Sequence, residues 1–143
     1  MKRVELLAPA GDLDRLKIAI RYGANAVYIG GKRFSLRSRA SNFDLKDIAK
    51  GVEFAHRHDA HVHVTVNMLP HEEDLEGISE YLKDLESIGV DAIIVASLSI
   101  MQLAKKVAPK LEVHVSTQHS STNSSVVKLY ESLGMDRVVL ARE

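Results

Sequence analysis

The sequence predicts an α/β protein with a parallel sheet, TIM-barrel-like but incomplete, with about six strands and five helices. Short apolar segments alternate with segments of helical periodicity along the whole chain, and each strand candidate ends in small or polar residues. Such alternation is typical of a parallel sheet with right-handed crossovers. An open doubly wound sheet is the alternative. The first strand–helix turn, PAGDL, lacks the glycine-rich dinucleotide fingerprint, which favours a barrel, and a complete barrel needs about 250 residues.

The spacing of hydrophobic residues predicts where the individual strands and helices lie. The expected strands are residues 4–8, 26–29, 61–66, 92–96, 112–116 and 137–140, of which HVHVTV (61–66) alternates most regularly. The expected helices are residues 13–22, 45–56, 72–88, 98–107 and 124–133. Asp12, Asp44 and Ser97 stand where helix N-caps are needed, and glycines follow several of the helices. Pro9-Ala10-Gly11 is expected to form the turn after the first strand.

Length and composition limit the classes of protein. With 143 residues, the chain is expected to form one domain over residues 1–143 with no second domain. Lys+Arg and Asp+Glu are both 19, which argues against a general nucleic-acid coat protein but leaves room for a local basic patch. The absence of cysteine excludes disulfides, a thiolate nucleophile and cysteine-ligated metal centres within this chain. No signal peptide or membrane span is visible, so a cytoplasmic location is expected.

Polar residues at the strand ends predict the position of a site. The segment LEVHVSTQHSSTN (111–123) runs from an alternating strand into eight consecutive polar residues. Active sites of parallel α/β folds lie at the carboxyl ends of the strands. Placing the more apolar side chains under the helices leaves a second set facing inward: Glu5, Tyr28, Gly30, His63, Thr65, Asn67, Ile94, His114, Ser116, Gln118, Val139 and Glu143.

Three of these residues are candidates for catalysis. The carboxamides of Asn67 and Gln118 can orient a carboxylate, a carbonyl or a base edge, or they can satisfy loop backbone groups instead. Glu143 has the chemistry of a general acid or base, although it is also the last residue of the chain.

His63 and His114, with Glu5, resemble a two-histidine, one-carboxylate metal set. They lie in mid-strand, below the usual level of a site, so we interpret them as interior histidines that bond to neighbours. No metal site is predicted.

The loop KRFSLRSR (32–39) carries four positive charges in eight residues. It follows the second expected strand and so lies on the same face as the strand-end residues. It is suited to bind phosphate or another anion, or RNA, where arginine and aromatic side chains stack on bases. The alternative is a solvated loop.

Several segments together resemble a known family: VELLAPAGD (4–12), NAVYIGGKRFSLR (25–37), TVNMLPHEEDLEGISEYLKDLESIGVDAIIV (65–95), VHVSTQHSSTN (113–123) and RVVLARE (137–143). They are similar to the N-terminal part of the collagenase-like peptidase family U-32, over essentially the whole chain. The resemblance implies a TIM-like barrel. Members are named as peptidases, although no recognisable triad establishes a catalytic type. Better-characterised relatives are RNA hydroxylation enzymes that make hydroxylated uridine in tRNA or hydroxylated cytidine in ribosomal RNA. Some depend on prephenate, and others serve oxygen-independent ubiquinone hydroxylation.

The resemblance also assigns substrate-binding candidates, which are Gly30, Gly31, Arg37, Ser116, Thr117, Asn123 and Arg142. Relatives carry downstream cysteines that look like iron–sulfur ligands. This chain ends before them, so a cluster is implied for the full-length relatives only. Relatives more often have an Ala-Asn pair after STQ, so His119 and Ser120 are given no role. We therefore expect an N-terminal fragment that is inactive by itself.

Three functions remain open at this point. The first is part of an RNA hydroxylation enzyme that binds RNA and a small carboxylate such as prephenate. The second is a collagenase-like peptidase acting on a peptide substrate. The third is a non-catalytic partial barrel that forms homo-oligomers through its exposed sheet edges.

Overall fold

The computed structural model describes residues 4–36 and 43–143, in which six parallel strands form one sheet. The strands are β1 (Leu7–Ala10), β2 (Ala26–Gly30), β3 (His61–Val66), β4 (Ala92–Val95), β5 (Glu112–Val115) and β6 (Arg137–Val138). The helices are α1 (Leu13–Arg21), α2 (Leu45–Arg57), α3 (Leu75–Ile88), α4 (Leu98–Val107) and α5 (Ser124–Ser132), with 3₁₀ turns η1 (Glu72–Asp74) and η2 (Thr117–His119).

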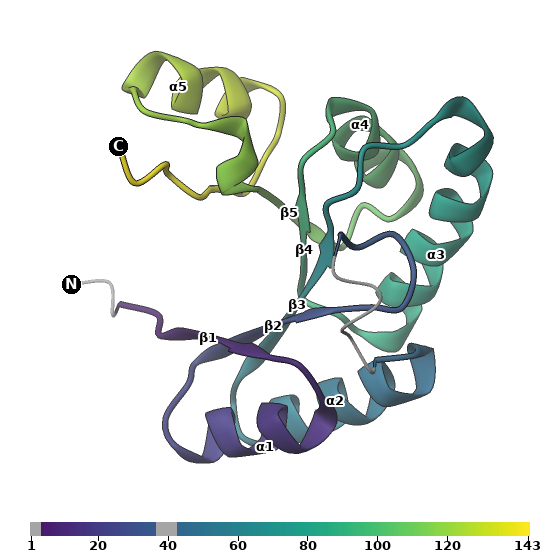
Figure 1. The fold of residues 1–143 in the computed structure, drawn as a ribbon, viewed down its shortest axis with the longest axis vertical. Helices are drawn as coiled ribbons and strands as arrows, with labels where there is room; N and C mark the ends of the chain where they lie inside the picture. The colour runs from purple at the N-terminus through teal and green to yellow at the C-terminus, as the bar shows by residue number, and fades with distance from the viewer. Residues whose placement is uncertain (1–3, 37–42) are drawn as a thin grey trace.

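The strand order decides between the two architectures. The strands pair in sequential order from β1 to β6, and every pair is parallel. Because each right-handed crossover then moves in the same direction, the helices collect on one face of the sheet, as in a barrel. A doubly wound sheet would need a reversal of strand order. Helices α1 to α4 pack against one another in sequence, and the C-terminal end lies on the side away from α3 (Figure 1). The predicted incomplete TIM-barrel-like fold is confirmed.

The hydrophobic core lies between the sheet and the helices. Val62, Val64 and Val66 of β3 are fully buried in it, together with helix residues such as Leu16 and Leu82. The alternate residues of β3, including His63, face the other side of the sheet. The alternation in β3 thus separates the residues that face the helices from those that face the inner side of the partial barrel.

The first strand was placed wrongly by the sequence. It spans Leu7–Ala10 instead of residues 4–8, so Pro9 and Ala10 belong to the strand rather than to the turn. Pro9 pairs with Tyr28 across the β1–β2 ladder. A proline is tolerated there because β1 is an edge strand, where the missing N–H leaves no partner unsatisfied.

Other boundaries differ by smaller amounts. The predicted helix 72–88 divides into η1 and α3, and the strand predicted over 137–140 is limited to Arg137–Val138, although the amide of Val139 still donates to the carbonyl of Val115 at 2.9 Å. Asp12 and Asp44 cap α1 and α2 as predicted. Ser97 occupies the cap position of α4, but its hydroxyl bonds to that of Ser99 at 2.7 Å instead.

Candidate functional site

A cavity of about 680 Å³ opens at the carboxyl end of the sheet. Its lining comes mainly from residues at or just beyond the ends of β1, β2, β3, β5 and β6, together with Tyr28 and Ile94 from within β2 and β4. We call it the carboxyl-end cavity, and it is lined by Leu7, Pro9, Ala10, Gly11, Tyr28, Gly30, Ser35, Leu36, Thr65, Asn67, Ile94, Ser116, Thr117, Gln118 and Val139. Many of the residues expected to face inward are therefore brought together here.

The end of β3 anchors the beginning of the basic loop. The Oδ1 of Asn67 accepts a hydrogen bond from the amide of Leu36 at 3.1 Å, and the hydroxyls of Ser35 and Thr65 bond at 3.0 Å. The Thr65 hydroxyl also bonds the carbonyl of Ile29 at 3.2 Å. One carboxamide oxygen of Asn67 thus satisfies loop backbone, which was the alternative interpretation, while its N–H groups make no hydrogen bond to another described residue.

The turn after β5 supplies a second carboxamide. Ser116 caps η2, and its hydroxyl accepts from the amide of Gln118 at 3.3 Å and bonds the Gln118 side-chain oxygen at 3.2 Å. The nitrogen of this carboxamide remains available to a ligand. Ser116 is buried, and no described histidine or other base is its partner, so it lacks the environment of a serine nucleophile.

The carboxyl-end cavity contains no charged lining residue in the described part of the chain. Arg142 and Glu143 are exposed and do not line it, and the side chain of Asn123 caps α5 by accepting from the amide of Val126 at 3.1 Å. Arg37 lies outside the described residues. Among its described lining residues, the cavity therefore offers amide and hydroxyl groups for binding, and no carboxylate, histidine, lysine or arginine.

Phe34 of the basic loop packs on α3. The guanidinium of Arg33 lies 4.8 Å from the Phe34 ring centroid, and Phe34 lies 5.4 Å from the ring of Tyr81. Tyr81 is buried, which raises its pKa to about 12, and a Cβ added to Gly31 would collide with its hydroxyl. Gly31 thus has a packing role beside the cavity instead of lining it. Sequence reasoning did not single out Ser35, Leu36 or Tyr81. Ser35 and Leu36 were included only as part of the basic loop, and the contact of Tyr81 with Phe34 joins segments far apart in the sequence.

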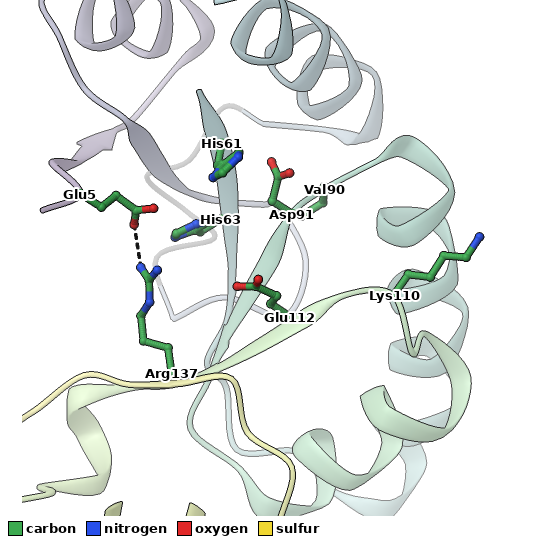
Figure 2. A pocket seen from close by; sticks show the side chains of 8 residues that line it. All are labelled: Glu5, His61, His63, Val90, Asp91, Lys110, Glu112 and Arg137. Atoms are coloured by element: carbon green, nitrogen blue, oxygen red, sulfur yellow. Dashed lines mark hydrogen bonds and ion pairs between the residues drawn. The ribbon is translucent and has the colours of Figure 1, made fainter. Parts of the chain in front are cut away.

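A second cavity, of about 370 Å³, lies at the opposite end of the sheet (Figure 2). This amino-end cavity is lined by Glu5, His61, His63, Val90, Asp91, Lys110, Glu112 and Arg137. All of them except His63, the third residue of β3, precede or begin their strands. Glu5 and Arg137 form an ion pair of 2.6 Å between the two ends of the chain. The hydrogen bond from Arg137 lowers the pKa of Glu5.

The two interior histidines meet beside this cavity. The rings of His63 and His114 are nearly perpendicular, with centroids 4.8 Å apart, and His114 Nε2 lies 2.9 Å from a Glu112 oxygen. Burial lowers the pKa of His63 to about 4 and also lowers that of His114. Within residues 4–36 and 43–143, no group of three or more His, Cys, Asp or Glu is arranged to hold a metal ion. None of the helices in these ranges is long and apolar enough to cross a membrane.

Comparisons with known proteins agree with the resemblance in the sequence. Residues 11–143 match the model of Peptidase family U32. The chain is 51% identical to tRNA hydroxylation protein P1 of Bacillus subtilis, across 99% of this chain and 34% of that protein. It is 44% identical to the 23S rRNA 5-hydroxycytidine synthase of Escherichia coli, across 99% of this chain and 21% of that protein. The chain thus spans about a third or less of the length of these curated relatives.

Solved structures share the fold at low sequence identity. The U32 peptidase Mk0906 superposes with a TM-score of 0.79 at 12% identity, across 98% of this chain and 59% of that one. A phosphonopyruvate hydrolase superposes with a TM-score of 0.67 at 12% identity, across 99% and 59% of the two chains. These structures support the partial barrel, and the family match supplies the identity. The chain belongs to peptidase family U32.

Proposed function

We propose that this chain forms the substrate-binding part of an RNA hydroxylation enzyme of the U32 family. The observation that carries the proposal is the uncharged carboxyl-end cavity, lined by amides and hydroxyls, with a basic loop anchored at its edge. Relatives that are 34–51% identical are named for the hydroxylation of tRNA, and another for an rRNA cytidine. In this proposal, residues 1–143 are the N-terminal part of one larger barrel domain.

The cavity and the loop would hold different parts of the substrates. The carboxamide nitrogens of Asn67 and Gln118, with the Thr117 hydroxyl, can donate to a small carboxylate such as prephenate or to a base edge. Gly30 lets a ligand approach the backbone closely at the end of β2. The arginines of the loop, including Arg37, would contact RNA phosphates, as would Arg142 beyond β6.

Redox chemistry has to come from outside this chain in the proposal. The sequence has no cysteine, and the described residues contain no metal-binding group, so an iron–sulfur cluster does not fit here. We derive no step through such a cluster. Glu143 stays a proposed acid or base that would need further chain to bring it to the cavity. The isolated chain should therefore bind substrates without turning them over.

RNA binding tests this function directly. Binding of transcribed tRNA, followed by fluorescence anisotropy between 50 and 300 mM salt, should give a log–log slope that falls by about one for each phosphate contact removed. The triple variant Arg33→Ala, Arg37→Ala and Arg39→Ala should show this fall. Arg57→Ala, an exposed arginine on α2, is the matched control. An unchanged slope in the triple variant would remove the loop from the proposal.

Binding of a small carboxylate is a separate measurement. Addition of prephenate should shift the side-chain amide NMR signals of Asn67 and Gln118, and Asn67→Ala should weaken the binding. Exposed Gln102 on α4 provides both a control signal and a control substitution. Equal shifts at Gln102 would show that the effect does not arise in the cavity.

A peptidase remains the second candidate because of the family and because a Methanocaldococcus jannaschii relative, 43% identical, is named an uncharacterized protease. The site favours it less, since the described residues offer neither a serine paired with a base nor a metal group. Digestion of gelatin by the purified chain would support the peptidase function. Activity that survives both metal chelation and Glu143→Ala would rule out Glu143 as the catalyst.

Self-association is a further proposal for the isolated chain. Within residues 4–36 and 43–143, β1 and β6 each pair on one side only, and Leu6 and Leu140 next to them are 58% exposed. Unpaired edges and exposed leucines favour association of copies. Light scattering after size exclusion should find a dimer or larger species, and a monodisperse monomer at high concentration would contradict this.

A further inference from the structure

The amino-end cavity carries groups that the proposed function does not use. It lies at the starts of the strands, whereas the carboxyl-end cavity lies at their ends, and the two share no lining residue. Its volume of about 370 Å³ is within the roughly 300–1,000 Å³ that small-molecule sites occupy. An inference about it is therefore independent of RNA or carboxylate binding.

Carboxylates dominate the charge around this cavity. Glu5, Asp91 and Glu112 line it, and their side chains surround the histidines of β3 (Figure 2). Arg137 neutralises Glu5, while Lys110 extends away from the other side chains in the same view. Asp91 and Glu112 have no lysine or arginine partner among the described residues, which gives the cavity a net negative character. Asp91 lies 3.0 Å from His56 Nε2 and accepts from the Val62 amide at 2.8 Å. Glu112 lies 2.9 Å from His114 Nε2, so a ligand would share the oxygens of both carboxylates with these partners.

His63 adds a polar atom that lacks a partner. Its side chain is 2% exposed, and its Nδ1 is buried without a hydrogen bond to any described residue. Since burial lowers the pKa of His63 to about 4, the imidazole is neutral near pH 7. A neutral imidazole has one nitrogen that accepts a hydrogen bond, and leaving a buried polar atom unpaired is costly.

The geometry points to a site for a small organic cation of the alkylammonium or guanidinium type, held by Glu5, Asp91 and Glu112 with His63 Nδ1 accepting one of its N–H groups. Such cations carry several N–H donors and a spread charge, which suits acceptors that lie around a cavity. A bare metal ion suits it less, because the described residues place no three ligands close enough to share one.

An NMR titration that follows the histidine side chains tests this site. We would add 1,4-diaminobutane to the 143-residue chain at pH 7.5 and follow the imidazole nitrogen signals by NMR. The His63 signals should shift saturably, with affinity decreasing from the diamine to butylammonium and no saturable shift from neutral butanol. Exposed His58, the C-cap residue of α2, should not respond.

Removing a negative charge and removing a positive charge from the cavity should change the affinity for the diamine in opposite directions. Glu112→Gln should weaken binding about threefold or more, since a part-exposed ion pair is lost. Arg137→Gln should strengthen it, because Glu5 is then freed for the ligand. Glu53→Gln, which removes an exposed carboxylate of α2, should change nothing. A role of these residues in stability alone would not move affinity in both directions.

Three outcomes would overturn the inference: no saturable shift of His63, an equal shift with butyrate, or the same affinity in Glu112→Gln and Glu53→Gln. If Glu112→Gln fails to fold by circular dichroism, the ligand series and Arg137→Gln decide. The salt dependence of RNA binding should be the same with and without saturating diamine after correction for ionic strength. Failure of this site would therefore leave the proposed function standing, and the reverse also holds.

Discussion

Replacing His63 by glutamine should remove a large part of the acid sensitivity of the fold. The His63 side chain is buried and lies against His114, with Glu5, Asp91 and Arg137 as the other charged or titratable groups that act on it. Burial is the main cause that lowers its pKa from 6.5 to about 4. The unfolded chain therefore takes up a proton at this residue at a higher pH than the folded chain does.

The size and the pH range of the effect follow from this difference. A pKa lowered from 6.5 to about 4 leaves the folded state at full stability above pH 6.5 and weakens it as the pH falls, until the loss is complete below about pH 4. At 1.36 kcal/mol per pKa unit, the full loss is about 3 kcal/mol, and the loss at pH 5 is about 2 kcal/mol. Such a loss is a sizeable fraction of the stability of a small domain.

Denaturant unfolding at pH 7.5 and pH 5.0 measures how much the free energy of unfolding changes between the two pH values, in the variant and in the unchanged chain. The free energy of unfolding of His63→Gln should fall between the two pH values by about 2 kcal/mol less than that of the unchanged chain. His61→Gln, an exposed residue on the same strand, is the matched control and should keep the original pH dependence. If His63→Gln loses as much stability as the unchanged chain, burial does not hold His63 neutral and the reasoning is refuted.

Three other substitutions test packing and electrostatics. Gly31→Ala should cost about 1–3 kcal/mol because its Cβ would collide with the Tyr81 hydroxyl, and Tyr81→Phe in the same chain should restore much of it; additive effects in a double-mutant cycle would contradict the contact. Asn123→Ala should cost about 1 kcal/mol in thermal unfolding by removing the cap of α5, whereas Asn123→Asp should not. Burial raises the pKa of Asp136, but hydrogen bonds from Lys105 and from an amide of β5 outweigh it and lower that pKa. The deficit of Asp136→Asn should therefore be present at pH 7 and shrink as the pH falls below 3.8; a deficit that stays constant in acid would count against this pairing.

The pattern of the sequence was sufficient for the fold because each element carries its own signal. Alternation in residues 61–66 places β3 with its bounds unchanged, and the helix over 98–107 is likewise found where it was predicted. The same alternation separates the buried valines of β3 from Thr65 and Asn67, which line the carboxyl-end cavity. Rules for strand ends then locate the site, because they depend only on the direction of the strands.

Contacts between distant segments were beyond this kind of reasoning. The bond from Leu36 to Asn67 joins residues 31 positions apart, and the ion pair of Glu5 with Arg137 joins residues 132 apart. Local periodicity shows that such residues are polar and where they lie along a strand, but it does not choose their partners. For the same reason the sequence placed β1 too early, since only the pairing of Pro9 with Tyr28 reveals that the strand continues through the proline.

The two ends of the sheet divide the polar groups in a way that constrains mechanism. Ionised side chains line the amino-end cavity, among them Glu5, Glu112 and Arg137, while the described residues that line the carboxyl-end cavity are all uncharged. Because its described lining holds no carboxylate, histidine or lysine, we expect this cavity to orient a substrate more than to transfer its protons. Substitution of Asn67 or Gln118 in a complete enzyme should therefore raise KM more than it lowers kcat, because each removes binding shared by the ground state and the transition state. A loss of kcat alone would instead place these carboxamides at the reacting atoms.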